Sequence, residues 1–230
     1  MTAWQQWLEH PERLRIRSAI FQLHLWIGAA LSMYVFLVSV TGSVVVFRNE
    51  LSRRFFVQRL VDLHTSLGAG ETGRIVNGFG AVCVTLLVLT GIVIWWPGVQ
   101  HWRRSLKVNY AAHFARITWD FHSAFGFWTL PLVLVWAVTG VYFAFPQLTN
   151  VFYRIDPNDR FTDPALFWLA QLHFGRFNIF TEVLWSVLGL VPAALAFTGV
   201  FICCRRIMFQ KPSRPDRETD SNSLQVPTGR

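Results

Sequence analysis

Four long apolar stretches alternate with shorter polar and charged segments along the chain. They lie at roughly 18–47, 75–96, 119–145 and 181–204. Each stretch reaches the length of about 20 residues that a helix needs to cross the hydrocarbon core of a bilayer. This pattern predicts an all-α membrane protein, a bundle of four transmembrane helices. The first stretch is too long for the apolar part of a signal peptide, so we expect it to be retained.

The segments outside the four apolar stretches are more polar than those stretches. Residues 1–17 predict an amphipathic cytoplasmic lead-in, and residues 207–230 predict a disordered cytoplasmic tail because they are rich in Pro, Ser and charge. The connection at 48–74 holds a basic helical stretch and a glycine-rich turn, and the one at 146–180 holds a short apolar segment suited to a membrane interface. Two of the predicted helices contain an internal proline: Pro131, which should kink its helix or be accommodated by a neighbouring helix, and Pro192.

The chain repeats a two-helix unit. HLWIGAALSMYVFLVSVTGSVVVF begins at His24, and HSAFGFWTLPLVLVWAVTGVYFAF begins at His122. In both, Gly follows the His by four residues and a Thr-Gly pair lies at the same offset. His64 and His173 each precede another apolar run that also ends in Thr-Gly. These matches predict two tandem repeats, at about 18–97 and 116–206, within a transmembrane domain at 18–206.

Composition and charge narrow the class of protein. Hydrophobic residues make up 53% of the chain and aromatic residues 16%, which is unlike an ordinary soluble domain. If both termini lie on one side, that side holds 13 Lys and Arg against 8 on the other, so the positive-inside rule favours cytoplasmic termini. The net charge of +8 fits contact with anionic membrane lipid, and no basic segment carries a nucleic-acid-binding motif.

The four repeat-matched histidines predict a cofactor. His24 and His122 lie at the cytoplasmic ends of their helices, and His64 and His173 lie at the opposite ends. A pseudo-two-fold axis between the repeats would bring each pair to the centre of the bundle. Two facing neutral imidazoles are the axial ligands of a low-spin b-type haem. We therefore expect two groups of haem b, one near each membrane face, with these histidines on the iron.

Small and basic residues complete the predicted sites. A porphyrin is broad and flat, so helices beside it must lack side chains, and the Thr-Gly pairs supply such positions: Gly42 and Gly140 for the outer haem, and Gly91 and Gly199 for the inner haem. Arginine suits the anionic propionates. The arginine candidates are Arg48, Arg74 and Arg176 outside, and Arg103, Arg205 and Arg206 inside. Trp136 is a candidate for the space between the two haems.

The same histidines and glycines also fit simpler roles. A histidine at a helix end can be an interfacial polar residue, and glycine serves close helix packing in membranes. Two alternatives therefore stay open for the whole chain: a haem-free scaffold or assembly subunit of an iron-uptake system, and a metal-ion carrier.

The chain resembles the PepSY-associated transmembrane proteins, which include bacterial inner-membrane ferric-siderophore reductases. The resemblance covers about 18–206. It is carried by LHLWIGAALSMYVFLVSVTGSVVVFRNEL, LHTSLGAGETGRIVNG, LLVLTGIVIWWPG, FHSAFGFWTLPLVLVWAVTGVY, LHFGRF and LAFTGVFICCRR. It implies a haem-dependent oxidoreductase of the bacterial inner membrane that delivers electrons to periplasmic ferric complexes, and the family's histidines match the four repeat-matched ones by motif.

The chain departs from larger members of this family, which insert a periplasmic PepSY domain between the first two membrane helices. Only the 27 residues at 48–74 separate these helices here. The expected partners are a ferric siderophore or other ferric chelate, a cytoplasmic or quinol electron donor, and a periplasmic partner protein or second copy of the chain. Three arginines are placed to steer an anionic chelate: Arg53, Arg54 and Arg59.

Overall fold

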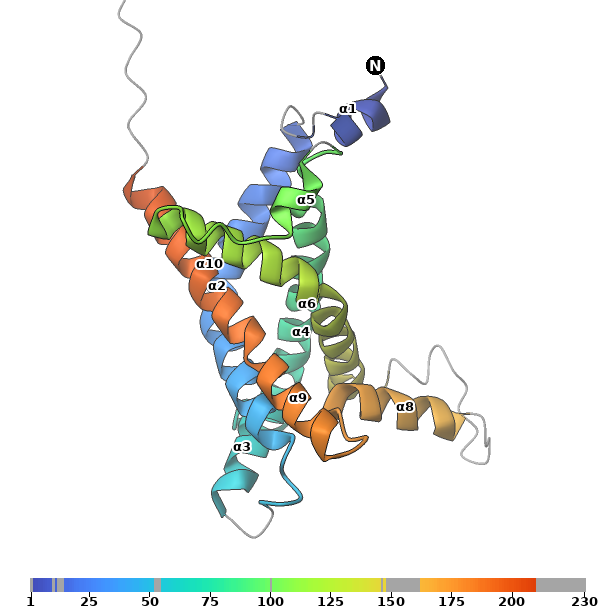
Figure 1. Cartoon of the computed structure of the whole chain (residues 1–230). Helices are drawn as coiled ribbons and strands as arrows, with labels where there is room; N and C mark the ends of the chain where they lie inside the picture. The colour runs from blue at the N-terminus through green and yellow to red at the C-terminus, as the bar shows by residue number, and fades with distance from the viewer. Residues whose placement is uncertain are drawn as a thin grey trace, which may run out of the picture.

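Four long helical paths run side by side between the two ends of the molecule (Figure 1). They are α2 (Arg15–Val45), α4 (Gly70–Trp95), α6 (Phe114–Ala144), and α9 (Ile179–Gly189) continued by α10 (Val191–Met208). The computed structural model describes residues 2–9, 11, 15–51, 55–99, 101–145, 147 and 162–209. All four paths are long and apolar enough to cross a membrane. The predicted all-α bundle of four transmembrane helices is confirmed.

The helices follow one another around the bundle in the order α2, α4, α6, α10. α2 packs against α4 and α10, and α6 packs against the same two helices. α2 and α6, which occupy the same place in the two repeats, therefore lie diagonally across the bundle. The most extensive contacts join one repeat to the other, α2 to α10 and α4 to α6. The two repeats thus form a single body.

Short helices lie at both ends of the bundle. The upper end in Figure 1, where α2 begins and α10 ends, carries α1 (Ala3–Glu9) and α5 (Trp102–Ser105). The lower end carries α3 (Phe55–Ser66) and α8 (Thr162–Phe174), and α8 runs sideways away from the bundle. α8 contains the short apolar segment predicted from the sequence. α3 extends further along the chain than the predicted basic stretch, so its last turn includes His64.

One of the two internal prolines interrupts its helix. Proline has no backbone N–H and clashes with the preceding turn, and the path with Pro192 divides into α9 and α10 just before it. The Ser39 hydroxyl of α2 bridges the division, since it donates to the carbonyl of Gly189 and accepts from the N–H of Ala193. Pro131 lies within α6, which continues as one helix.

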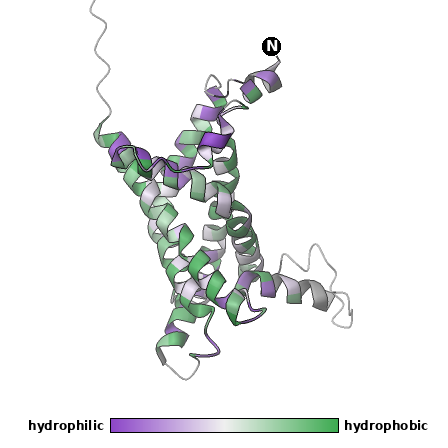
Figure 2. Ribbon diagram, viewed as in Figure 1, coloured by the Kyte–Doolittle hydropathy of each residue, from purple (hydrophilic) through white to green (hydrophobic). Residues whose placement is uncertain are grey.

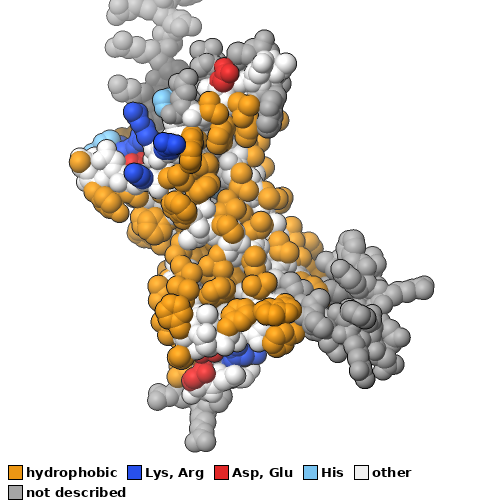
Figure 3. Space-filling view, turned by 45° about the vertical axis from the view of Figure 1, so that its right-hand side comes forward, with side chains coloured by type: hydrophobic (Ala, Val, Ile, Leu, Met, Phe, Trp, Pro, Cys, Tyr) orange, Lys and Arg blue, Asp and Glu red, His pale blue; other side chains and the backbone are white. Residues whose placement is uncertain are grey.

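The surface between the two ends is apolar. Figure 2 shows hydrophobic colouring along the middle of the bundle and hydrophilic colouring towards both ends. In Figure 3 hydrophobic side chains cover the visible face, and Lys and Arg gather at the upper end. Large apolar side chains point outwards, as Met33 and Phe197 do with 76% and 75% of their surface exposed. Such a surface suits lipid contact, and the chain is a multi-pass membrane protein.

Candidate functional site

The upper end brings together His24 of α2 and His122 of α6. Their ring centres are 6.5 Å apart and their ring planes meet at 86°. Because α2 and α6 are diagonal neighbours, the two imidazoles face each other across the middle of the bundle. Both line a cavity of about 320 Å³, the upper cavity, which is bounded by all four helical paths.

The lower end brings together His64 and His173. The rings come from the last turns of α3 and α8, with ring centres 6.4 Å apart and planes at 57°. Both line a second cavity of about 260 Å³, the lower cavity. The predicted pairing of one histidine from each repeat therefore holds at both ends.

A threonine from a Thr-Gly pair contacts each histidine, and both residues belong to the same repeat. In every case the ring atom is Nδ1 and the threonine atom is Oγ1. The four contacts are His24–Thr90 at 2.9 Å, His122–Thr198 at 2.9 Å, His64–Thr41 at 3.3 Å and His173–Thr139 at 2.6 Å.

These contacts favour a proton on Nδ1 of each ring. Each threonine hydroxyl also donates to a carbonyl one turn earlier in its own helix, as Thr90 does to Leu86 at 2.8 Å. The hydroxyl oxygen is then the acceptor of the imidazole Nδ1–H. A neutral ring with its proton on Nδ1 keeps a lone pair on Nε2. Hydrogen bonds of this kind fix the tautomer and orientation of metal-binding histidines.

The separation of the rings fits one metal ion between two imidazoles. A first-row metal lies about 2.0–2.1 Å from an imidazole nitrogen. A ring nitrogen lies about 1.1 Å from its ring centre, so two rings on opposite sides of one metal have centres about 6.3 Å apart. The observed separations are 6.5 and 6.4 Å. Within the described ranges, no group of three or more His, Cys, Asp or Glu side chains is placed to hold a metal ion.

The four predicted glycines lie at the two cavities, and three of them border a histidine ring. A Cβ atom added to Gly42 would lie 2.8 Å from Cε1 of His64. An added Cβ would lie 3.5 Å from His24 at Gly91 and 3.4 Å from His122 at Gly199. Gly42 therefore makes room for the imidazole of His64, whereas a Cβ at Gly91 or Gly199 would make an ordinary contact with the ring beside it. An added Cβ at Gly140 would instead meet Ala81 of α4, at 3.5 Å.

Two further glycines leave open space in the upper cavity. Gly28 and Gly126 line it, and each lies one turn after a histidine of the upper pair. A Cβ at Gly126 would meet no atom within 4 Å, and one at Gly28 would meet only Leu87 at 3.8 Å. The repeated spacing, with Gly four residues after His in both repeats, could have predicted this role, but these two glycines were not assigned to the predicted site.

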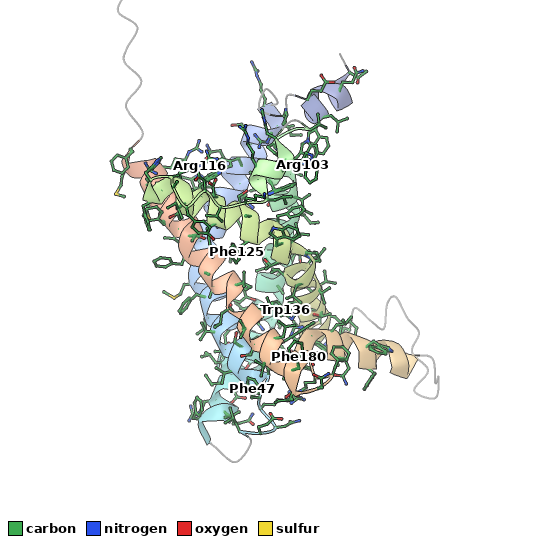
Figure 4. The ribbon with its side chains drawn as sticks, in the orientation of Figure 1. Phe47, Arg103, Arg116, Phe125, Trp136 and Phe180 are labelled. Atoms are coloured by element: carbon green, nitrogen blue, oxygen red, sulfur yellow. The ribbon has the colours of Figure 1, made fainter. Side chains whose placement is uncertain are left out.

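Four aliphatic residues, one from each helical path, separate the cavities. This aliphatic belt lines both cavities and consists of Val35, Val84, Val133 and Pro192. Trp136 lines only the lower cavity, and its indole N–H donates to the carbonyl of His173 at 3.1 Å. Figure 4 shows Trp136 towards the lower end of the molecule. Trp136, the candidate for the space between the two sites, thus borders the lower cavity, whereas Val133, one turn earlier on α6, borders both cavities.

Arg74 lines the lower cavity, but its guanidinium group already binds other residues of the chain. Its Nε donates to Glu71 at 3.0 Å, and its Nη1 donates to the carbonyl of Ala144 at the end of α6. A cation at the C-terminal end of a helix is favoured by the helix dipole. Arg74 therefore joins α4 to the end of α6, whatever else it binds.

Arg48 and Arg176 share an aromatic ring beside the lower cavity. Their guanidinium carbons lie 4.9 and 5.7 Å from the centre of Phe174, which lines the cavity. Burial, followed by the positive charge of Arg176, lowers the pKa of Arg48.

The arginines predicted for the upper site are placed differently. Arg103 and Arg205 are exposed and do not line the upper cavity. Arg206 lies 4.7 Å from the ring centre of Phe21, which does line it. Arg17, which the sequence reasoning did not assign to a site, lines the upper cavity and donates to two carbonyl oxygens at the end of α4, at 2.7 and 3.3 Å. Arg53, Arg54 and the chain beyond residue 209 lie outside the described residues.

Burial keeps the lower pair of imidazoles neutral. It lowers the pKa of His64, although a hydrogen bond to the Val38 carbonyl acts in the opposite direction. Burial lowers the pKa of His173 to about 3, and the neighbouring His64 adds to this effect. Both rings therefore keep the lone pair that a metal ligand needs.

Comparison with known proteins gives a family match and one distant relative. The family model described as the PepSY-associated TM region matches residues 52–158, which include His64 and His122. The uncharacterized protein PA4219 of Pseudomonas aeruginosa is 32% identical over 84 residues, 35% of this chain. The chain spans about a fifth (20%) of that relative's length. No solved structure matches the chain.

The matched region begins just before α3 and runs past the end of α6. It therefore includes α4 of the first repeat and α6 of the second, which pack against each other. Residues 52–158 of the chain are thus similar to the PepSY-associated TM region.

Proposed function

We propose that the protein carries electrons across the membrane through two b-type haems, each held by two histidines. The observation that carries the proposal is the pair of imidazole–imidazole separations, 6.5 and 6.4 Å, at the two ends of one membrane bundle. A metal ion with four equatorial ligands of its own needs two further ligands from the protein. Each end offers that number.

The side chains around each pair have defined tasks in this proposal. The Nε2 atoms would hold the iron of a bound haem, and the threonine hydroxyls would hold each ring in the tautomer that leaves Nε2 free. Gly28 and Gly126 leave open space beside the upper pair. Bound haem supplies reversible one-electron iron chemistry. The aliphatic belt keeps water and ions from passing between the two cavities.

The direction of electron transfer follows from the predicted orientation, and the partners follow from the resemblance to ferric-siderophore reductases. With the upper end in the cytoplasm, a cytoplasmic donor or a quinol supplies one electron at a time to the upper site. The lower site then passes the electron to a periplasmic ferric chelate, such as a ferric siderophore, and Fe(III) becomes Fe(II). The similarity of residues 52–158 to the PepSY-associated TM region supports placing the chain in an iron-uptake reaction of the bacterial inner membrane.

Electron transfer can be measured in sealed vesicles. Purified protein is reconstituted with ferric citrate and a ferrous-specific dye trapped inside, and the impermeant reductant dithionite is added outside. The proposal predicts dye colour in vesicles with the wild-type protein and loss of colour in both the His24→Ala and His173→Ala variants. Equal rates in protein-free vesicles and vesicles with wild-type protein would contradict it.

A further inference from the structure

A tight turn at Gly175 follows α8 and comes just before Arg176. Gly175 has a φ of 67°, in the left-handed region that favours glycine. A Cβ atom at Gly175 would overlap the side chain of Trp185, so the close approach of α9 also requires glycine. The N–H of Gly175 donates to the carbonyl of Gln171 at 2.7 Å. The backbone of this turn is thus tightly constrained, and the guanidinium group of Arg176 lies beside the ring of Phe174.

The two arginines at Phe174 have no counter-ion in the described part of the chain. Neither Arg48 nor Arg176 forms an ion pair with a described carboxylate, whereas Arg74 at the same end pairs with Glu71. The Nη2 atom of Arg176 is buried and has no hydrogen-bond partner among the described residues. A buried guanidinium N–H without an acceptor is unfavourable, and two adjacent cations repel each other. Both features would be relieved by a bound anion.

We infer that Arg48 and Arg176 together bind a carboxylate at the edge of the lower cavity. This inference rests on the proposed function, because it assigns a ligand to the lower site. Guanidinium groups bind carboxylates through paired N–H donors. Phe174 contacts both arginines and lines the cavity, so the carboxylate belongs to a molecule in the cavity or at its mouth. Two sources share this chemistry, namely a propionate of a macrocycle in the cavity and a carboxylate of an anionic ferric chelate.

The test compares three probes on one variant. The double variant Arg48→Gln/Arg176→Gln is titrated with haem b, with haem b dimethyl ester, whose propionates are uncharged, and with ferric citrate as electron acceptor. A control variant that also loses two charges, Arg104→Gln/Lys107→Gln, removes one exposed side chain in α5 and one just after it. Hydrogen bonds to charged groups predict a loss of at least about tenfold in affinity.

The outcomes separate the two sources. Loss of lower-site affinity for haem, with unchanged affinity for the ester, assigns the site to a propionate. A rise of about tenfold or more in KM for ferric citrate, with unchanged haem content, assigns it to the external chelate. If the double variant matches the control with all three probes, the inference is overturned.

Two further measurements separate this inference from the proposed function. If wild-type protein binds no haem, the proposed function fails. Calorimetric titration of the haem-free protein with citrate then decides the inference by itself: binding lost in the glutamine variant supports it, and no binding to the wild type overturns it. The variant Arg48→Lys/Arg176→Lys keeps both charges but not the paired donors, and its affinity should be intermediate. It replaces the glutamine variant if that one does not fold.

Discussion

In the proposed function, the hydrogen bond at Nδ1 leaves Nε2 of each histidine free to bind a metal. All four rings donate to a threonine of their own repeat, and all four threonines belong to Thr-Gly pairs. The sequence predicted the histidines and the glycines from their repeated spacing. It did not assign the threonines, because spacing along a chain does not show which hydroxyl on a neighbouring helix reaches a ring.

The two threonines of the lower pair should differ in importance. Nδ1 of His64 also contacts the carbonyl of Val38 at 3.0 Å, whereas Nδ1 of His173 has one hydrogen-bond partner among the described residues, Thr139 at 2.6 Å. Thr139→Val should therefore weaken haem binding at the lower site by about 10–100-fold, and Thr41→Val should weaken it less. Haem affinity and the midpoint potential of the lower site would be measured, and Thr139→Ser should restore both. Equal effects of the two valine variants would show that Thr139 is not the principal acceptor.

The buried imidazole of His173 predicts the pH dependence of stability. Its pKa is lowered from 6.5 to about 3, so between these pH values the folded protein binds fewer protons than the unfolded chain. Stability is therefore complete above about pH 6.5 and falls as the pH is lowered through this window. Thermal unfolding of the haem-free protein at pH 7 and pH 4.5 measures the effect, and His173→Gln should reduce the difference between the two temperatures. An unchanged difference would exclude His173 as a cause.

At the scale of elements, the apolar stretches predicted the four helical paths and the short helix α8. The ends of helices were less accessible to sequence reasoning. The sequence predicted a basic helical stretch over 49–60, whereas α3 runs from Phe55 to Ser66 and brings His64 into its last turn. The division between α9 and α10 is bridged by Ser39, which lies 150 residues before Gly189 in the chain, so Pro192 alone did not predict two helices.

Helix spacing at the lower site predicts unequal responses at two matched glycines. Gly42 and Gly140 occupy the same place in the two repeats. An added Cβ at Gly42 would lie 2.8 Å from the ring of His64, whereas one at Gly140 would meet Ala81 at 3.5 Å, an ordinary contact. Gly42→Ala should therefore displace His64 and remove haem from the lower site, and Gly140→Ala should retain it. Haem content per chain measures both, and retention by Gly42→Ala would contradict the geometry.

At the scale of the whole molecule, the internal repeat predicted the pairing of histidines at both ends. The repeat could not predict what lies between the pairs, because that depends on which side chains from four helices meet at one level. Trp136 was the sequence candidate for this place, since it is large and lies on the same helix as His122. The structure instead places one aliphatic residue from each helical path there.

The aliphatic belt should block the passage of protons. Val84→Gly/Val133→Gly would join the two cavities, and water could then connect the two ends of the bundle. Vesicles with this variant should lose an imposed pH gradient faster than vesicles with the wild-type protein, as followed by a trapped pH-sensitive dye. Val138→Gly removes an outward-facing residue, 50% exposed, from the same helix and serves as the control. Equal leak rates in all three samples would show that the belt is not the barrier.

The central claim is that each end of the bundle holds one haem between two histidines. Haem content per chain, taken with the optical spectra before and after dithionite, tests this claim most directly when the protein is purified from cells supplied with haem. The account predicts two low-spin haems per wild-type chain and one in each of the four variants His24→Ala, His122→Ala, His64→Ala and His173→Ala. A colourless wild-type protein, or unchanged haem content in all four variants, would contradict it.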